Sequence, residues 1–203
     1  MFEDYHEWIQ LQTTAGGLPA NIIGYLGMRL VRLMAHNDLR SPNLILPSLT
    51  LSKYLSPDSL PLRPSRPQMH RWPVPQRQSS EHPSTTEYEL LKTRLEAFIT
   101  IQKGEGIEIA KGISYDSLDA YYLGKLELWH IHPVDKSFHV HLHPADAKVV
   151  VERGWGEWFG LTGKVGQGMG VVFVYAARTE EDIEGLEKIW EASVMFAKDG
   201  GKI

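Results

Sequence analysis

Five of the chain's nine histidines fall within one stretch of fourteen residues. The five are His130, His132, His139, His141 and His143. Imidazole is the side chain whose charge changes most readily near neutral pH, so clustered imidazoles suit general acid–base catalysis and the polarisation of a substrate oxygen. A lone histidine here would be an ordinary half-exposed strand residue, but a cluster of titratable groups points to a functional site. We predict that His130, His132 and His139 are catalytic and that His141 contacts the substrate.

The spacing of these histidines predicts a β-hairpin. Two runs that favour extended structure flank residues 133–137, whose composition is typical of a turn. Side chains alternate between the two faces of a strand, so His130 and His132 share one face. His139 and His141 likewise share one face of the partner strand.

The turn length decides which histidines face each other. A two-residue turn at Val134–Asp135 places His130 directly opposite His139. Two adjacent cationic rings repel each other, so we expect at least one ring of this pair to have a lowered pKa. Glu127 has odd spacing from His130 and would reach the same face only through a bulge or a neighbouring strand.

A metal site is the alternative interpretation of the same residues. His-x-His on one strand is a common ligand pair, and a third histidine could complete a facial set. The usual carboxylate a few residues downstream is missing, and the chain has no cysteine for a thiolate site. From the sequence we therefore expect no metal.

Other residues are candidates for holding a substrate. Trp155 stands between Gly154 and Gly156, which allow the backbone to turn sharply and present the ring. We expect Trp155 and Phe159 to shape an apolar pocket or its rim, with plain core packing of Trp155 as the alternative. Arg77 is one of four arginines in a proline-rich stretch, and one of these reaching inward would bind a carbonyl or enolate oxygen.

That proline-rich stretch, residues 41–84, holds nine of the chain's twelve prolines. Proline lacks an N–H group and restricts the residue before it, so regular helix or central strand is excluded. The apolar content, which includes Leu55 and Trp72, is too high for a typical linker. We predict an ordered strap that packs on the following domain.

Composition narrows the class of protein. The chain has 203 residues, 42% of them hydrophobic, and a net charge of −4, so one globular domain is expected and nucleic-acid binding is not. The absence of cysteine fits a reducing compartment. No basic and apolar signal segment and no run of about 20 apolar residues occurs, so we expect a cytoplasmic protein without a membrane span.

The pattern of elements predicts an α+β fold, with an antiparallel sheet covered by helices. Ser84 and Glu87 have capping-box spacing and open a helix that ends near Gly104. Its inward face is formed by Leu91, Leu95, Phe98 and Ile99. Strands are expected near residues 107–115, 120–132, 137–143 and 169–176.

Three further helices are predicted. Pro144 suits the first position of a short helix over residues 145–153, and Thr179 with Asp182 caps the last helix. The last helix has an apolar stripe of Ile183, Leu186, Trp190 and Val194. Residues 18–34 form a helix whose apolar stripe would cap the core. That stripe consists of Ile22, Ile23, Leu26, Leu30, Leu33 and Met34.

At the hairpin the sequence resembles the fungal luciferase family. The matching residues are Glu127-x-x-His130-x-His132, His139, Gly154-Trp155-Gly156, Phe173-x-Tyr175-Ala176-x-Arg178-x-Glu180-Glu181 and Glu191-Ala192-Ser193. The softer matches in the strap are Arg66-Pro67 and Gln76-Arg77-Gln78. The resemblance runs from about residue 25 to the C-terminus, and its C-terminal half is specific.

The resemblance implies an enzyme that joins molecular oxygen to a hydroxylated pyrone without flavin, metal or nicotinamide. It also implies a place beside biosynthetic genes for fungal polyketides and terpenoids. Three features depart from the family: the membrane-anchoring N-terminal helix is absent, Ala177 replaces a proline, and Glu157–Gly160 replaces a stretch with histidine and proline. Light emission is therefore not implied.

These observations predict a cofactor-independent enzyme of fungal secondary metabolism, acting on an apolar, oxygenated small molecule. The reaction would be a cyclisation, cycloaddition or isomerisation, with Arg77 or Arg178 steadying negative charge. The alternatives are oxygen addition to an enolisable substrate and a non-catalytic binding protein. We expect residues 1–84 to form an N-terminal helix and strap packed on a catalytic domain of residues 85–203.

Overall fold

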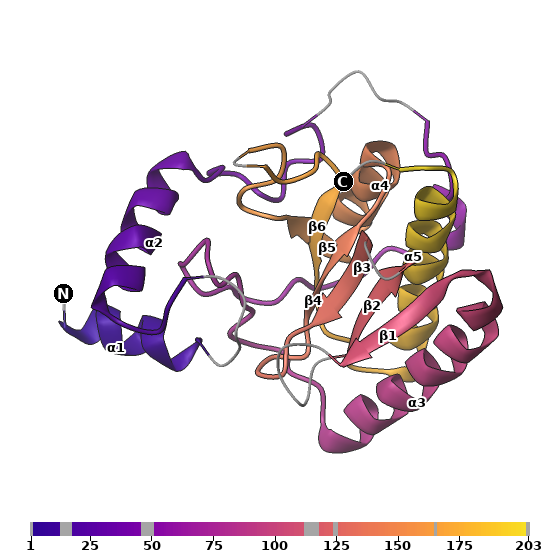
Figure 1. The fold of residues 1–203 in the computed structure, drawn as a ribbon, viewed down its shortest axis with the longest axis horizontal. Helices are drawn as coiled ribbons and strands as arrows, with labels where there is room; N and C mark the ends of the chain where they lie inside the picture. The colour runs from indigo at the N-terminus through magenta and orange to yellow at the C-terminus, as the bar shows by residue number, and fades with distance from the viewer. Residues whose placement is uncertain are drawn as a thin grey trace.

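The computed structural model describes residues 2–12, 18–45, 51–111, 118–123, 126–164 and 166–201. Its centre is a six-stranded antiparallel sheet with the strand order β1-β2-β3-β4-β6-β5 (Figure 1). The strands are β1 (Ile107–Lys111), β2 (Leu118–Tyr122), β3 (Leu126–Ile131), β4 (Phe138–His141), β5 (Gly156–Trp158) and β6 (Val171–Val174). The predicted α+β class with an antiparallel sheet is confirmed.

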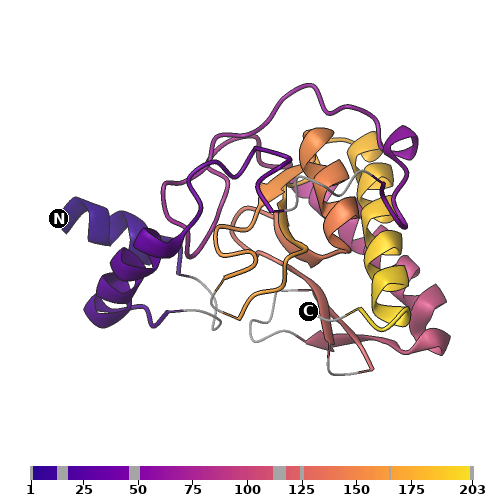
Figure 2. The same cartoon turned by 90° about the horizontal axis from the view of Figure 1, so that it is seen from above.

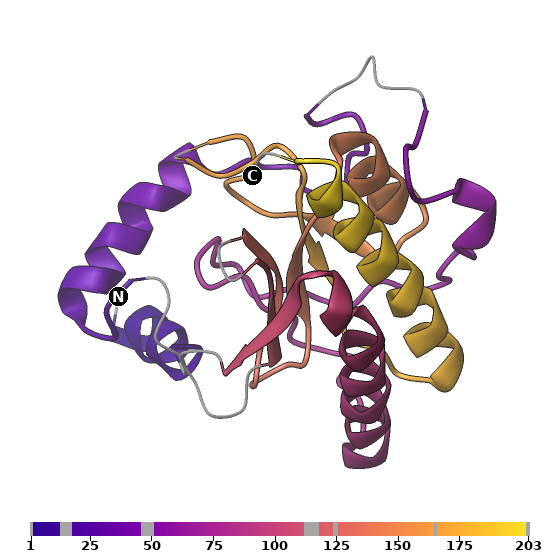
Figure 3. The ribbon, with the colours of Figure 1, turned by 45° about the vertical axis from the view of Figure 1, so that its right-hand side comes forward.

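The described residues form five α-helices, which lie on both sides of the sheet. They are α1 (Phe2–Gln10), α2 (Ile22–Met34), α3 (Thr85–Gln102), α4 (Pro144–Glu152) and α5 (Glu180–Lys198). Two short 3-10 helices span Pro57–Ser59 and Lys103–Glu105. Figure 2 shows α4 and α5 on one side of the sheet, and Figure 3 shows α1 and α2 standing together on the other side.

Side chains alternate between the two faces of the sheet, so the core residues and the histidines lie on opposite faces. Phe138 and Val140 of β4 are fully buried in the main apolar core, together with side chains of α3, α4 and α5. His139, between them, points to the opposite face of the sheet because successive strand residues alternate. One face of the sheet thus builds the core, and the other carries the histidines.

The local signals for helix starts place the helices as predicted. The Ser84 hydroxyl accepts a hydrogen bond from the Glu87 amide, and the Glu87 carboxylate accepts one from the Ser84 amide. Pro144 occupies the first turn of α4, and the Thr179 hydroxyl caps α5. The predicted inward-facing residues of α3 and α5 are all buried.

Two strand predictions need correction. The single strand expected over residues 120–132 is two strands, β2 and β3, and the chain turns after β2 at Leu123, whose φ is 51°. The short strand β5 was not predicted, because three residues show no clear alternation. The end of the strand predicted over residues 107–115 lies outside the described residues beyond residue 111.

Helix α2 buries a different face from the one its apolar pattern predicts. All six residues of the predicted stripe are exposed. The buried residues are Gly24, Tyr25 and Met28, which pack with Trp8 of α1 and Trp72 of the strap in a second, smaller cluster. The prediction that the stripe caps the core was wrong, because helical periodicity identifies an apolar face without identifying its partner.

The described part of the strap lies against the sheet and its helices. Leu55 and Leu60 are buried in the main core, and Trp72 joins the smaller cluster. The backbone amide of Arg63 donates to the Arg153 carbonyl at 2.8 Å, and that of Gln78 donates to the Asp135 carboxylate at 2.7 Å. Residues 46–50 of the predicted strap lie outside the described residues.

Candidate functional site

The hairpin formed by β3 and β4 sets the register of the histidines. His130 pairs directly with His139, as predicted. The loop is longer than the predicted two-residue turn at Val134–Asp135, because the amide of His132 donates to the Ser137 carbonyl at 2.8 Å and closes a four-residue loop. His130 still pairs with His139, as the two-residue turn predicts. The longer loop includes residues 133 and 136 but does not shift one strand along the other.

A β-bulge brings Glu127 to the face that carries the histidines. Trp129 pairs with Ala120 of β2, but Glu127 pairs with the next residue, Tyr121, so β3 contains one extra residue at this point. An extra residue reverses the alternation of side chains beyond it. The Glu127 carboxylate therefore lies 2.5 Å from Nδ1 of His130. A bulge is one of the two arrangements that the sequence allowed for this contact.

Three histidine rings come together on this face, and we call them the histidine cluster: His130, His132 and His139. The rings of His130 and His132 both point at one atom, Nδ1 of His139. Nδ1 of His139 lies 3.2 Å from Nε2 of His130 and 3.2 Å from Nε2 of His132. The three ring centroids are 4.7–5.0 Å apart. Among the described residues, this trio of nitrogens could hold a metal ion, because one nitrogen from each ring lies within 4.8 Å of the others.

A second layer of polar groups holds two of the rings. Nδ1 of His132 lies 2.8 Å from the Ser137 hydroxyl, which also hydrogen-bonds the buried Asp135 carboxyl. The Glu127 carboxylate holds His130 and accepts a hydrogen bond from the Tyr121 hydroxyl at 3.3 Å. These contacts fix both ring orientations and direct the two Nε2 atoms toward His139.

The electrostatics of the site favour neutral rings at His132, His139 and His141 and an ionised Glu127. Burial lowers the pKa of both His132 and His139 well below 6.5, and the nearby Arg77 charge acts in the same direction. Burial also lowers the pKa of His141 to about 4. Burial opposes ionisation of Glu127, but its interactions with His130, His141 and the Tyr121 hydroxyl together outweigh this effect and lower its pKa.

The cluster opens into a cavity of about 490 Å³, within the size range of small-molecule sites. The cavity lies between helix α2, the strap and the sheet. It is lined by Leu18, Val31, Val74, Pro75, Gln76, Arg77, Glu127, His130, His139, His141, Phe159, Leu161, Gln167 and Val171. The wall is mainly apolar, and its polar groups are concentrated at the histidines, Glu127 and Arg77.

Arg77 is a buried cation facing this cavity. Its residue is only 6% exposed, and its guanidinium donates to the neighbouring Gln76 carbonyl at 2.7 Å. Its Nε atom has no hydrogen-bond partner, and no ion pair to a carboxylate within 4.0 Å forms among the described residues. Burial lowers the pKa of Arg77 to about 10. Such a group has donors available for an anionic oxygen of a ligand.

Of the residues predicted to bind substrate, the structure brings Arg77, His141 and Phe159 to the cavity. The Phe159 ring lies against the His139 ring, with centroids 4.7 Å apart in an edge-to-face contact. Trp155 does not line this cavity: it is buried in the main core, and its indole N–H donates to the Pro61 carbonyl at 2.6 Å.

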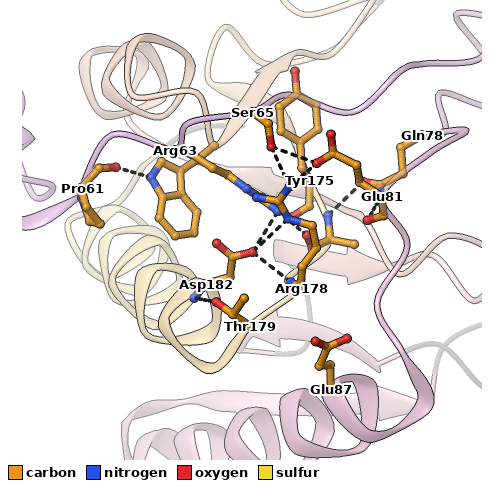
Figure 4. Close-up of polar contacts among 12 residues, drawn as sticks. Pro61, Arg63, Ser65, Gln78, Glu81, Glu87, Tyr175, Arg178, Thr179 and Asp182 are labelled. Carbon is orange, nitrogen blue, oxygen red and sulfur yellow. Dashed lines mark hydrogen bonds and ion pairs between the residues drawn. The ribbon is translucent and has the colours of Figure 1, made fainter.

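Arg178 also lies away from the cavity. It forms ion pairs with Glu81 and Asp182 and donates to the Ser65 hydroxyl (Figure 4). These contacts join the strap to the start of α5. The arrangement gives Arg178 a structural role in fastening the strap.

Several cavity residues carried no signal in the sequence. Gln76, Leu18 and Val31 line the cavity although they are far from the histidines along the chain. Gln76 lies in the strap, Val31 in α2 and Leu18 just before α2, and only tertiary packing brings them to the cavity. The Gln-Arg-Gln motif at residues 76–78 was the one available hint.

Comparisons with known proteins find similarity over the segment that carries the histidine cluster. Residues 125–193 match the family model described as the luciferase domain. Over 75 residues the chain is 37% identical to a luciferase of Armillaria mellea and to a luciferase of Armillaria gallica. Each alignment covers 36% of this chain and 28% of the relative's length. No solved structure matches the chain.

In the described parts of the chain, no helix has the length and hydrophobicity needed to cross a bilayer. The family match includes the histidine cluster, Glu127 and Phe159 within residues 125–193. The resemblance predicted from the sequence is thereby confirmed for this segment: residues 125–193 of the chain are similar to the luciferase domain.

Proposed function

We propose that this protein is an enzyme that transforms an apolar small molecule bearing an enolisable carbonyl or hydroxyl group. The observation that carries the proposal is the cavity, in which an apolar wall meets a buried arginine and two histidines, His130 and His139, whose rings converge with that of the buried His132. Such a site would bind an oxygen-bearing hydrocarbon skeleton and desolvate its reacting atoms. Polyketides and terpenoids of fungal secondary metabolism have this chemistry.

The roles of the residues follow from their positions. Arg77 would hold the oxygen on which negative charge develops, and the histidine cluster would polarise that oxygen and help to move the proton. Phe159, Leu161 and Val171 would hold the apolar skeleton. Preorganised donors of this kind contribute about 10²–10³ in rate each.

The reaction we favour is an isomerisation or ring closure of the enolised substrate. A proton leaves a carbon beside the carbonyl, the enolate forms, and a proton returns after the skeleton has rearranged or closed. Atoms and electrons are conserved, so no flavin or nicotinamide takes part. We place the reaction in the cytoplasm, which the cysteine-free composition permits.

A second candidate is oxygen addition to the enolate carbon, which the similarity to two luciferases supports. That reaction consumes one O₂ per turnover and forms a new carbon–oxygen bond. A third candidate is a binding protein that holds the same ligand without converting it.

One assay separates the three candidates. The protein is incubated with a hydroxylated pyrone as probe, while dissolved oxygen and the mass of the product are followed. Isomerisation or ring closure gives a product of unchanged mass without oxygen uptake, whereas oxygen addition consumes oxygen and adds oxygen atoms. Quenched tryptophan fluorescence without product would indicate a binding protein.

Variants of the cluster connect turnover to the site. Replacing His130, His132 or His139 by alanine should lower turnover by about tenfold or more, as expected for loss of a group active in proton transfer. His70 in the strap is the matched control, since its ring lies outside this cavity. If all three cluster variants keep their circular dichroism spectrum and full turnover, the proposed site is wrong.

A further inference from the structure

The protons of the histidine cluster can be placed from its neighbours. Nδ1 of His130 faces the Glu127 carboxylate at 2.5 Å, and an ionised carboxylate only accepts hydrogen bonds. Nδ1 of His130 therefore carries a proton. In the neutral ring, Nε2 then presents a lone pair toward His139.

The same reasoning applies to His132. Nδ1 of His132 lies 2.8 Å from the Ser137 hydroxyl and 3.7 Å from a carboxyl oxygen of Asp135. A hydroxyl oxygen can accept the proton of an Nδ1–H group, and the nearby carboxyl favours a proton on Nδ1. Nε2 of His132 therefore also presents a lone pair toward His139.

His139 cannot give each neighbour a full hydrogen bond. Its Nδ1 atom lies 3.2 Å from each Nε2 atom, but one imidazole nitrogen carries at most one proton. The two contacts therefore either share that one proton in a weaker three-centre hydrogen bond or leave one Nε2 atom without a partner. Buried polar groups left in this state call for an explanation, such as a bound ion.

A cation removes the conflict, because all three nitrogens can then direct lone pairs at it. Metal–nitrogen bonds of about 2.0–2.1 Å at tetrahedral angles place two ligand nitrogens about 3.4 Å apart. The two nitrogen–nitrogen distances of 3.2 Å are close to this spacing. Glu127 and Ser137 hold the outer nitrogens of two rings, as carboxylates and hydroxyls commonly do behind metal-binding histidines.

We infer that His130, His132 and His139 bind one divalent transition-metal ion, with Zn²⁺ as the reference ion. Three imidazoles suit Zn²⁺ and its neighbours in the first row, whereas Mg²⁺ and Ca²⁺ prefer oxygen ligands. His130 and His139 line the cavity, so a fourth coordination position faces the bound small molecule. A three-histidine site with an open position is typical of catalytic zinc.

The charge of Arg77 opposes a dication at this place, and two carboxyl groups offset it. Glu127 and Asp135 lie behind the outer nitrogens of His130 and His132. Arg77 points into the same cavity and suits an anionic substrate oxygen beside the metal. The sequence favours no metal, because the usual carboxylate a few residues downstream of the histidines on the same strand is missing. The structure shows that the nearest carboxylate, Glu127, precedes them and supports a ligand ring.

This inference rests on the proposed function only for the role of the ion, which would polarise the substrate oxygen as a Lewis acid. Binding is measured without substrate. Protein treated with a chelator and dialysed is titrated with Co²⁺, and the visible absorption bands of tetrahedral Co²⁺ are followed. Zn²⁺ then displaces the Co²⁺. We expect one ion per chain, bound with a Kd below about 10 µM, and a raised Tm with Zn²⁺.

The variants identify the ligands. Alanine at position 130, 132 or 139 should weaken Co²⁺ binding by about 100-fold or more, and Ser137→Ala should weaken it by about tenfold through the His132 ring. The control His70→Ala should bind as the wild type does. The inference is overturned if folded wild-type protein binds neither ion, or if His132→Ala binds both with wild-type affinity.

Activity distinguishes this inference from the proposed function. Full turnover by the chelated protein would leave the proposed enzyme intact and refute a metal role in catalysis. One tightly bound ion without conversion of any probe would support the metal site and count against the proposed enzyme.

Discussion

Two buried arginines of the strap have opposite surroundings. Arg63 forms an ion pair with Asp182 at 3.0 Å and donates to the Ala176 carbonyl at 2.7 Å. Arg77 donates to the carbonyl of its own neighbour and faces the cavity. Burial lowers the pKa of both side chains to about 10. A charge buried without a partner costs stability and is retained where it serves function.

Replacing the two arginines by methionine should therefore have opposite effects. A fall in pKa from 12.5 to about 10 corresponds to about 3 kcal/mol that disfavours the charged Arg77 in the folded state. We expect Arg77→Met to raise the free energy of unfolding by about 1–3 kcal/mol while turnover falls at least tenfold. Arg63→Met should lower the free energy of unfolding by about 3 kcal/mol, because Asp182 loses its partner.

Urea unfolding and turnover, measured on both variants, test this pair. Equal destabilisation by the two substitutions would show that Arg77 is a structural residue. Its assignment to the substrate site would then be withdrawn.

Phe159 contacts both the cavity and His139, and its substitution tests the shape of the pocket. The resemblance described above implies histidine in this stretch for the family. We expect Phe159→His to change the rate or the product ratio severalfold, because it makes an apolar wall polar. The ring is only partly buried, so the free energy of unfolding should change by less than about 1.5 kcal/mol. Global unfolding would instead assign Phe159 to the core.

At the scale of elements, the contact between Trp155 and α5 positions the helix beside the sheet. A Cβ atom added to Gly185 would lie 2.1 Å from the Trp155 ring, so only glycine allows this approach. Trp155 in turn follows α4 and precedes β5. The ring thus fixes α5 relative to the strands that carry the histidines.

Gly185→Ala should therefore destabilise the protein although it improves helix propensity. We expect a loss of about 1–3 kcal/mol from overpacking. Gly104→Ala is the matched control, since a Cβ atom there meets nothing within 4 Å and the change should cost little. The two Tm values check the prediction. A loss with Gly104→Ala equal to that with Gly185→Ala would contradict it.

At the scale of the whole molecule, the strap forms one wall of the site. Val74, Pro75, Gln76 and Arg77 line the cavity, and Arg63 and Arg178 fasten the strap to α5. We propose that residues 85–203 form the catalytic domain and residues 1–84 a cover packed on it. On this proposal the cover completes the site and is needed for activity.

Limited proteolysis tests that proposal. The native protein should resist cleavage between residues 55 and 80, because cleavage requires local opening that would expose the buried Leu55, Leu60 and Trp72. Arg63→Met should accelerate cleavage there by weakening the attachment. If the native wild-type protein were cleaved across this stretch as fast as the protein unfolded in urea, the strap would not be packed on the domain.

What the sequence determined by itself is local. The capping box at Ser84, the proline at position 144 and the threonine at position 179 place helix starts, because the groups that form each cap lie within four residues. The facing of His130 and His139 also follows from a short loop and strict alternation. These signals were sufficient for the fold class and for the centre of the site.

Tertiary structure decided the features that depend on distant partners. The pairing of β3 with β2 creates the bulge that turns Glu127 toward His130. Packing against Trp8 and Trp72 selects the buried face of α2, and the folding back of the strap carries Arg77 to the histidines. Helical or strand periodicity shows that a face is apolar or polar, but contacts between segments far apart in the chain decide what that face meets.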